Sequence, residues 1–285
     1  MEPQKVELGT VAQLKREGKP ITMVTAYDCP TARIVDAAGV DTVLVGDSAA
    51  NVVLGYPDTI PISMDEMIHH TRAVARGIRR ALLIGDMPFM SYNVSTEQAV
   101  ANAGRFLKEG GAKAVKVEGG GWVAGCVAAM VRAGIPVVGH LGLTPQTAGM
   151  LGGYRVQGRT AESAKKILDD ALGLQEAGAF MLVLECVPDR LGTLISRQLQ
   201  IPVIGIGAGS GTDGQVLVFH DLVGIQAGFT PKFVKRYLDA GSQMQQAVES
   251  YCREVRQRSF PAAEHSFPIS EEEFAALGEA LQGEE

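Results

Sequence analysis

Short hydrophobic segments recur along almost the whole chain, separated by stretches in which polar and apolar positions are mixed. Eight such segments are rich in β-branched residues, and they cover residues 21–27, 42–47, 81–88, 114–120, 136–142, 180–186, 202–209 and 215–221. In most of them the apolar residues are consecutive rather than alternating, which is typical of strands covered on both faces. The pattern therefore predicts eight buried strands in an α/β protein.

The segments between these strands carry helix start signals. Ser63 with Glu66, and Ser95 with Gln98, have the spacing of a capping box, in which two side chains satisfy free backbone amides at a helix start. Strands that alternate with helices pair in parallel, and eight such units close most naturally into a (β/α)8 TIM barrel. A doubly wound open sheet is the structural alternative.

The domain organisation follows from the absence of a linker rich in Pro, Ser or Gly. We therefore expect a single domain over residues 1–285, with the barrel core at about 20–250. An N-terminal helical extension is predicted over 10–18, because Thr10 and Gln13 have capping-box spacing. This helix is expected to cover the bottom of the barrel.

A second helical extension is predicted at the C-terminus, over about 268–285. Ser270 is a suitable N-cap residue for this helix. Its apolar stripe consists of Phe274, Leu277 and Leu281, and six glutamates lie elsewhere in 271–285. We interpret the segment as a docking helix with an acidic solvated face.

Composition and charge narrow the function classes. The 285 residues include 26 Lys and Arg against 32 Asp and Glu, a formal net charge of −6, which favours neither nucleic acid nor an anionic membrane surface. The sequence has no apolar stretch of about 18 residues and no secretory signal at its start. Its four cysteines form no CxxC pair, so we expect free thiols in the cytoplasm rather than a disulfide framework or a zinc site.

Polar residues follow the ends of five consecutive predicted strands. Active sites of (β/α)8 enzymes lie at the carboxyl ends of the strands, so these residues should converge on one mouth. Lys116 and Glu118 are two apart and therefore point to the same face of a strand. The full set of candidate site residues is Asp47, Ser48, Asp86, Lys116, Glu118, His140 and Glu185.

The residue types in this set favour metal-assisted chemistry on a 2-oxo acid. Asp47, Asp86 and Glu118 offer hard oxygen ligands, which suit Mg²⁺ rather than zinc. A bound Mg²⁺ could chelate the substrate and stabilise an enolate, with Glu185 as general base. A competing hypothesis makes Lys116 a Schiff-base nucleophile. Taken singly, each aspartate could merely cap a turn, and a lone histidine is more often a core residue.

Three other signals are discounted. The GxGxxG pattern at 209–214 precedes a predicted strand, whereas a dinucleotide fingerprint requires a helix there. His69 and His70 are adjacent on a predicted helix and cannot both face one metal ion. The cluster of Arg72, Arg76, Arg79 and Arg80 is interpreted as a solvated face.

Longer motifs carry a resemblance to a known family. They are GDS at 46–48, GYPDTIPISMDEMIHHTRAV at 55–74, GDMPFMSY at 85–92, VKVEGG at 115–120, GHLGLTPQ at 139–146, LGGYRVQGR at 151–159, LVLECVP at 182–188, IGIGAGSGTDGQVLVFHD at 204–221 and PKFVKRY at 231–237. Together these motifs resemble the ketopantoate hydroxymethyltransferases. The resemblance extends from about residue 5 to the HSFP at 265–268.

This resemblance implies a phosphoenolpyruvate/pyruvate-type barrel in a cytoplasmic homo-oligomer, with a decamer as the expected assembly. It implies one Mg²⁺ per subunit and 5,10-methylenetetrahydrofolate as co-substrate. The implied reaction adds a hydroxymethyl group to 3-methyl-2-oxobutanoate to give 2-dehydropantoate, in pantothenate biosynthesis. No nucleic acid or membrane partner is expected.

The resemblance also assigns roles by position. The metal ligands would be Asp47, Asp86 and Glu118, the substrate-binding residues Asp47, Ser48, Asp86, Lys116 and His140, and the proton acceptor Glu185. One departure lies at Ala49-Ala50-Asn51, where the family usually has Leu-Gly-Met, so the local loop and substrate fit could differ. An alternative function is that of a Mg²⁺-dependent 2-oxo acid lyase or phosphonomutase of the same barrel superfamily, which would not need folate. A non-catalytic binding protein on the same barrel is the other class.

Overall fold

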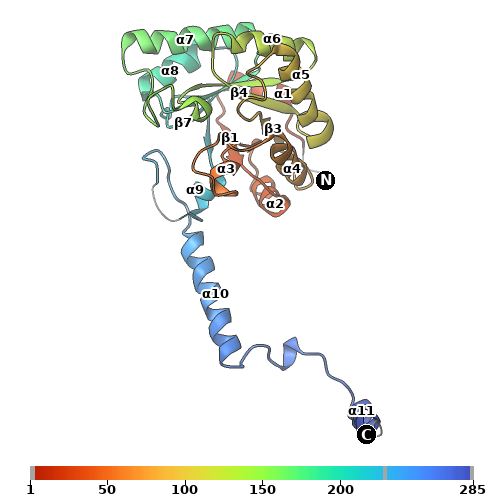
Figure 1. Cartoon of the computed structure of the whole chain (residues 1–285). Coiled ribbons are helices and arrows are strands. Elements are labelled where there is room, and N and C mark those ends of the chain that lie inside the picture. The colour runs from red at the N-terminus through yellow and green to blue at the C-terminus, as the bar shows by residue number, and fades with distance from the viewer. Residues whose placement is uncertain (1–3, 227–229, 283–285) are drawn as a thin grey trace. The chain divides into compact units, whose positions relative to one another are not determined.

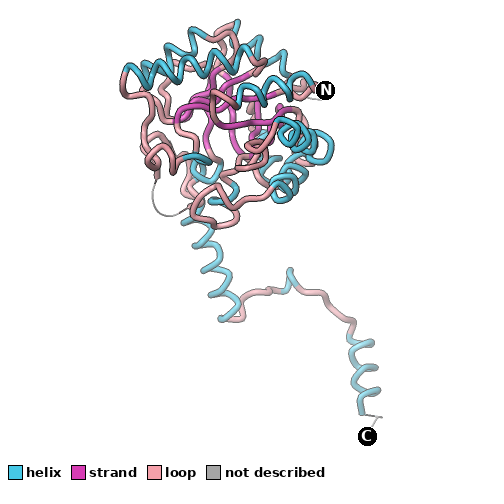
Figure 2. Tube along the Cα trace, turned by 45° about the horizontal axis from the view of Figure 1, so that its top comes forward, coloured by secondary structure: helices cyan, strands magenta, loops and turns pink. Residues whose placement is uncertain are grey.

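The chain forms a closed barrel of eight parallel strands (Figures 1 and 2). The computed structural model describes residues 4–226 and 230–282. The strands are β1 (Ile21–Thr25), β2 (Thr42–Val45), β3 (Leu82–Asp86), β4 (Ala114–Glu118), β5 (Val137–Gly142), β6 (Met181–Glu185), β7 (Val203–Ile206) and β8 (Gly214–Leu217). Each strand pairs with its sequence neighbours, and β8 pairs with β1 to close the ring. The predicted (β/α)8 topology is confirmed and the open sheet is excluded.

Alternation along each strand separates two hydrophobic layers. On β4, Ala114 belongs to the layer inside the barrel, whereas Val115 and Val117 belong to the layer between strands and helices. Because side chains alternate between faces, Lys116 and Glu118 share the inward direction of Ala114. The apolar interior therefore ends, toward the carboxyl ends of the strands, in inward-facing charged residues.

Helices connect the strands and cover the outside of the barrel (Figure 1). They are α2 (Cys29–Ala37), α3 (Ala49–Val52), α4 (Met64–Ala75), α5 (Thr96–Arg105), the π-helical turn η1 (Phe106–Gly110), α6 (Val123–Arg132), the 3₁₀ turn η2 (Pro145–Thr147), α7 (Ala161–Glu176), α8 (Asp189–Gln198) and α9 (Phe219–Val223). Ser63 and Ser95 accept the predicted cap hydrogen bonds at the starts of α4 and α5. The expected strand 215–221 is too long, because its last residues form α9 instead.

The N-terminal helix α1 (Leu8–Arg16) starts two residues before the expected position. Thr10 lies in the first turn rather than at the cap, and its hydroxyl accepts the backbone amide of Glu7 at 3.2 Å. Val11 is fully buried and packs with the apolar layer inside the barrel. The helix therefore closes the bottom of the barrel as the sequence predicted, with a different cap.

The chain divides into two compact units, Met1–Tyr237 and Leu238–Glu285. The second unit contains α10 (Ala240–Arg256), the short turn η3 (Ala263–His265) and α11 (Glu271–Gln282). Ser270 accepts the amide of Glu273 at 3.2 Å, so the predicted C-terminal helix forms with its predicted cap, and residues 283–285 lie outside the described ranges. Across the described residues, no helix combines the length and the apolar character needed to span a membrane.

Candidate active site at the carboxyl ends of the strands

All seven candidate residues line one pocket of about 640 Å³ at the carboxyl ends of the strands. Asp86 and Glu185 are the last residues of β3 and β6, and Asp47 follows β2 directly after Gly46. Ser48 starts the short helix α3. The separate strand ends thus meet at one mouth, because parallel strands in a closed barrel present the same end to the same side.

Lys116 lies at the centre of the charged cluster. Its Nζ is 2.9 Å from Asp86 Oδ1 and 3.2 Å from Glu118 Oε1, and its side chain is almost fully buried. Burial alone would lower the pKa of this ammonium, but the charges of Asp86 and Glu118 outweigh burial and raise it. Lys116 is therefore a fixed cation, and a neutral amine for Schiff-base chemistry is disfavoured.

His140 links two carboxylates from different strands. Its Nδ1 is 3.1 Å from Glu118 Oε1 and its Nε2 is 3.2 Å from Glu185 Oε2. Burial and Lys116 act to lower the pKa of His140, but the adjacent carboxylates of Glu118 and Glu185 raise it to about 9. A pKa in this range favours the charged imidazole at neutral pH, and Lys116 Nζ also lies 3.1 Å from Nδ1.

Asp47, Asp86 and Glu118 form a buried carboxylate triad, in which one oxygen of each residue lies within 4.8 Å of the others. Burial, followed by the charges of Asp86 and Glu118, raises the pKa of Asp47 well above its usual range. Glu118 behaves oppositely: burial acts to raise its pKa, but Lys116 and His140 lower it to about 2. The three groups therefore share one site with very different proton affinities.

The triad fits a divalent cation. Four carboxylates, counting Glu185, face only two cations of this cluster, so full ionisation leaves an excess of negative charge. Within the described residues, Asp86 Oδ1 is buried without a hydrogen-bond partner of suitable geometry. Hard oxygen ligands with no thiolate or paired histidine suit Mg²⁺. A divalent ion at the triad would remove the excess charge.

Ser48 and the residues after it form a small-residue corner of the pocket. The Ser48 hydroxyl lies 2.8 Å from the Tyr27 hydroxyl, and Tyr27 is buried. Ala49 and Ala50 are fully buried, whereas Asn51 lines the pocket and donates its side-chain amide to Tyr56 O at 3.0 Å. The segment expected to depart from the family pattern therefore contributes one pocket-lining side chain, Asn51, and two packed ones.

Cys186 follows Glu185 in the left-handed region, with φ of 47°. Burial, followed by the neighbouring carboxylate, raises the pKa of its thiol to about 12, so the thiol stays protonated. The four cysteines, all within the described ranges, are free. Cys186 therefore contributes an uncharged thiol to the pocket lining beside Glu185.

Sequence reasoning missed two buried residues of the site, Gln146 and Tyr92. The side-chain Nε2 of Gln146 donates to Asp47 Oδ2 at 2.9 Å, and its side-chain oxygen Oε1 accepts a hydrogen bond from the Tyr92 hydroxyl at 2.7 Å. Both residues lie within motifs that carry the family resemblance, but neither follows a strand end. No periodicity or spacing singles out a neutral amide in a 3₁₀ turn, so only its contacts identify it.

The discounted signals stay outside this cluster. β8 follows the GxGxxG segment, so the segment lacks the helix that a dinucleotide fingerprint needs. His69 and His70 lie on α4, and His70 Nδ1 is 2.8 Å from Tyr27 O, which explains its direction without a metal ion.

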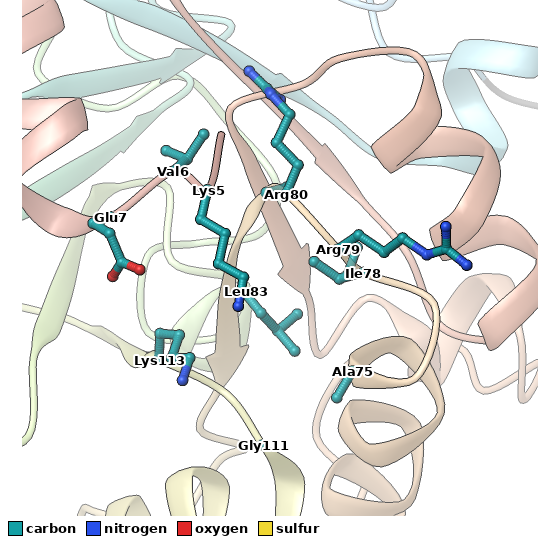
Figure 3. A pocket seen from close by; sticks show the side chains of 11 residues that line it. Lys5, Val6, Glu7, Ala75, Ile78, Arg79, Arg80, Leu83, Gly111 and Lys113 are labelled. Atoms are coloured by element: carbon teal, nitrogen blue, oxygen red, sulfur yellow. The ribbon is translucent and has the colours of Figure 1, made fainter. Parts of the chain in front are cut away.

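A second cavity of about 130 Å³ lies at the opposite end of the barrel, where β3 and β4 begin (Figure 3). Lys5, Arg79, Arg80 and Lys113 line it together with apolar residues. Arg80 points away from the centre of this cavity, and its guanidinium contacts Val40 O and Asp41. The cavity contains none of the candidate residues and is about a fifth of the size of the pocket at the mouth.

Comparison with known proteins shows which family the chain resembles. The sequence profile of the ketopantoate hydroxymethyltransferases matches residues 5–263. A 3-methyl-2-oxobutanoate hydroxymethyltransferase of Geobacillus kaustophilus is 55% identical over 270 residues, which are 95% of this chain and 97% of that protein. Another from Carboxydothermus hydrogenoformans is 52% identical over 268 residues, 94% of this chain and 97% of its own length.

Solved structures support the fold. A phosphonopyruvate hydrolase complexed with oxalate and Mg²⁺ has a TM-score of 0.60 at 14% identity, with 96% of each chain covered. A 2,3-dimethylmalate lyase, a member of the PEP mutase/isocitrate lyase superfamily, has a TM-score of 0.57 at 13% identity, with 99% of each chain covered. The barrel is therefore of the type found in that superfamily. The family profile and the curated relatives together show that this chain belongs to the ketopantoate hydroxymethyltransferase family.

Proposed function

We propose that the chain transfers a hydroxymethyl group from 5,10-methylenetetrahydrofolate to 3-methyl-2-oxobutanoate, in a step of pantothenate biosynthesis. The products are 2-dehydropantoate and tetrahydrofolate, and one water is consumed. The observation that carries the proposal is the charged cluster of one barrel mouth, in which a carboxylate triad lies beside a separate carboxylate, Glu185. Membership of the family supports the choice of substrates.

Asp47, Asp86 and Glu118 would hold one Mg²⁺ per subunit. When bound there, the ion supplies Lewis-acid stabilisation of the negative charge that develops on the keto oxygen. Asp47 must lose its proton to act as a ligand, because its pKa is raised in the metal-free site. Lys116 remains charged beside Asp86 and is available to bind the carboxylate of the 2-oxo acid.

Glu185 is the proposed general base. It is less buried than the triad, with 16% of its side chain exposed, and it lines the pocket opposite the strands of the triad. Its carboxylate would remove the C3 proton of the substrate to leave an enolate, which attacks the methylene carbon of the donor. His140 hydrogen-bonds Glu118 through Nδ1 at 3.1 Å, and its Nε2 forms an ion pair with Glu185 at 3.2 Å, so it would orient the base relative to the triad.

The size and lining of the pocket support a second, larger substrate. A five-carbon 2-oxo acid occupies a small part of about 640 Å³, which is the size range of pockets for drug-sized ligands. The lining also includes exposed residues, such as Tyr154 and Lys232, beside the buried cluster. The folate donor would use this outer part, with its methylene group directed toward the enolate.

Two further properties belong to the proposal. The family resemblance supports a homo-oligomer, with a decamer as the expected assembly, and a cytoplasmic location. Ser48 would contact the 2-oxo acid, since its hydroxyl lies at the pocket surface beside Asp47.

Proton NMR of 3-methyl-2-oxobutanoate in D₂O tests this function in two stages. With protein and Mg²⁺, the C3 proton signal should disappear, and EDTA should block the loss. Added 5,10-methylenetetrahydrofolate should then produce a hydroxymethyl signal. Proton exchange without transfer would favour the alternative lyase or mutase chemistry. Metal binding with neither signal would contradict the proposal.

A further inference from the structure

A neutral amide, Gln146, contacts two members of the carboxylate triad. Its side-chain Nε2 donates to Asp47 Oδ2 at 2.9 Å and to Met87 O at 3.0 Å. Its backbone amide donates to Glu118 Oε2 at 3.1 Å. One residue of the turn after β5 therefore contacts a carboxylate that follows β2 and another at the end of β4, and this residue is 2% exposed.

Tyr92 determines which way this amide faces. The Tyr92 hydroxyl donates to Gln146 Oε1 at 2.7 Å and accepts the backbone amide of Glu118 at 3.1 Å. Burial, followed by the charge of Glu118, raises the pKa of Tyr92, so the hydroxyl keeps its proton. A flipped amide would place Oε1 against Asp47 Oδ2 and Met87 O, and these are contacts between acceptors. Only one orientation of the Gln146 side-chain amide therefore agrees with its hydrogen-bond partners.

The neutrality of Gln146 matters for a site that binds a cation. Carboxylates held close together repel one another, and the three oxygens of the triad lie within 4.8 Å of one another. Hydrogen bonds from a neutral amide restrain the carboxylates without cancelling the charge that a metal ion would neutralise. Residues that orient metal ligands in this way typically contribute about 10–100-fold to metal affinity.

We propose that Gln146 and Tyr92 form a positioning pair that holds Asp47 and Glu118 at the spacing a divalent cation requires. The inference rests on the metal site of the proposed function. Neither side chain acts on the substrate: Gln146 acts through Asp47 and Glu118, and Tyr92 acts through Gln146. Loss of either side chain should therefore weaken metal binding first, and turnover at saturating metal less.

Titration of metal-stripped protein with Mn²⁺, followed by the electron paramagnetic resonance signal of free Mn²⁺, tests the pair. Gln146→Met keeps the length of the side chain and the backbone amide that donates to Glu118, but removes the side-chain amide that contacts Asp47 and Met87. Its Kd for Mn²⁺ should therefore rise about 10–100-fold. Tyr92→Phe keeps the ring and should raise Kd by a smaller factor. The double variant should raise Kd by less than the product of the single effects, because both act in one network.

Matched controls separate this role from general destabilisation. Gln13→Met makes the same substitution on α1, where the exposed Gln13 amide contacts only Glu17 among its described hydrogen-bond partners, and should leave Kd unchanged. Circular dichroism would verify the fold of each variant; if Gln146→Met does not fold, Tyr92→Phe carries the test. A Kd within twofold of the parent in the folded variants would overturn the inference. Failure of the unaltered protein to bind Mn²⁺ would instead contradict the proposed metal site, and Mn²⁺ binding without transfer would contradict the reaction alone.

Discussion

Two lysines at opposite ends of the barrel, Lys15 partly buried and Lys116 buried, have different surroundings. At the bottom, Lys15 of α1 donates to Ser196 O and Ile201 O at 2.9 Å and to Asp213 Oδ2 at 2.7 Å. Asp213 Oδ2 also accepts the amide of Val203 at 2.8 Å. Each of the three ammonium protons thus has an acceptor, and one cation meets one anion.

The cluster at the mouth lacks this balance. Lys116 lies among three carboxylates that act on its pKa, and within the described residues Asp86 Oδ1 and His140 Nε2 have no hydrogen bond of suitable geometry. Desolvating an excess of like charges costs free energy, and the two cations of the cluster offset only part of that cost. The ion pair between Lys15 and Asp213 has matched charges and fixes α1 on the barrel. The cluster at the mouth has excess negative charge and is therefore suited to bind a cation and substrate.

The largest expected effect is on the proposed base. Glu185→Gln keeps the size and shape of the side chain beside His140 but removes the proton acceptor, so kcat should fall on the order of 10²–10⁴-fold. KM for 3-methyl-2-oxobutanoate should change little. Steady-state kinetics with saturating Mg²⁺ measures both. Unchanged kcat in a folded variant would remove Glu185 from this role.

The pH dependence of metal binding should be the next largest effect. Asp47 has a pKa above 3.8, the usual value for an aspartate, so in the metal-free site it keeps its proton at pH values where a free aspartate has lost it. Metal binding must release that proton. Affinity for Mn²⁺ should therefore increase as pH rises, by up to about tenfold per unit for one released proton. Calorimetry in two buffers with different ionisation enthalpies counts the protons. Affinity that is constant with pH, with no proton released, would contradict the raised pKa.

Matched substitutions of two aspartates should change stability in opposite directions. Asp47→Asn removes a carboxylate that burial and its neighbours destabilise, so the metal-free protein should gain on the order of 1–2 kcal/mol in unfolding free energy. Asp213→Asn removes the charged partner of Lys15 and should cost about 1–3 kcal/mol. Urea unfolding with EDTA present measures both. Destabilisation by both substitutions to the same extent would contradict the contrast between the two ends.

The smallest effect is expected at the bottom cavity. Lys113 lines that cavity and is exposed, so Lys113→Ala should shift unfolding free energy by less than about 0.5 kcal/mol and leave kcat/KM unchanged. The same kinetic and unfolding assays apply. A large loss of activity would show that the basic end also contributes to function.

The sequence predicted the barrel because its strands are continuous apolar runs, and the polar residues after them marked the mouth. Strand boundaries were less accurate where hydrophobicity continues past the strand, as at Phe219, which packs in a helix. The predicted start of α1 was wrong because a threonine can occupy either the N-cap or the N3 position of a capping box. Thr10 occupies N3, where its hydroxyl accepts the backbone amide of Glu7, the N-cap residue.

The sequence predicted the charged residues of the site but not its neutral residues. Asp86 and Glu185 stand out as carboxylates at the ends of apolar strands. Gln146 is neutral and lies six residues after His140 in a turn, so its role depends on three-dimensional contacts with Asp47 and Glu118. The protonation of His140 likewise depends on neighbours from β4 and β6, which strand order alone does not reveal.

We expect a divalent cation to balance the excess negative charge of the carboxylates at the barrel mouth. The most direct test is a crystal of the metal-stripped protein soaked in Mn²⁺, with diffraction data collected for the anomalous signal of manganese. The account predicts one strong peak per chain, in contact with carboxylate oxygens of Asp47, Asp86 and Glu118, and loss of that peak in Asp47→Asn. A peak elsewhere, or an empty triad in protein that binds Mn²⁺ in solution, would contradict it.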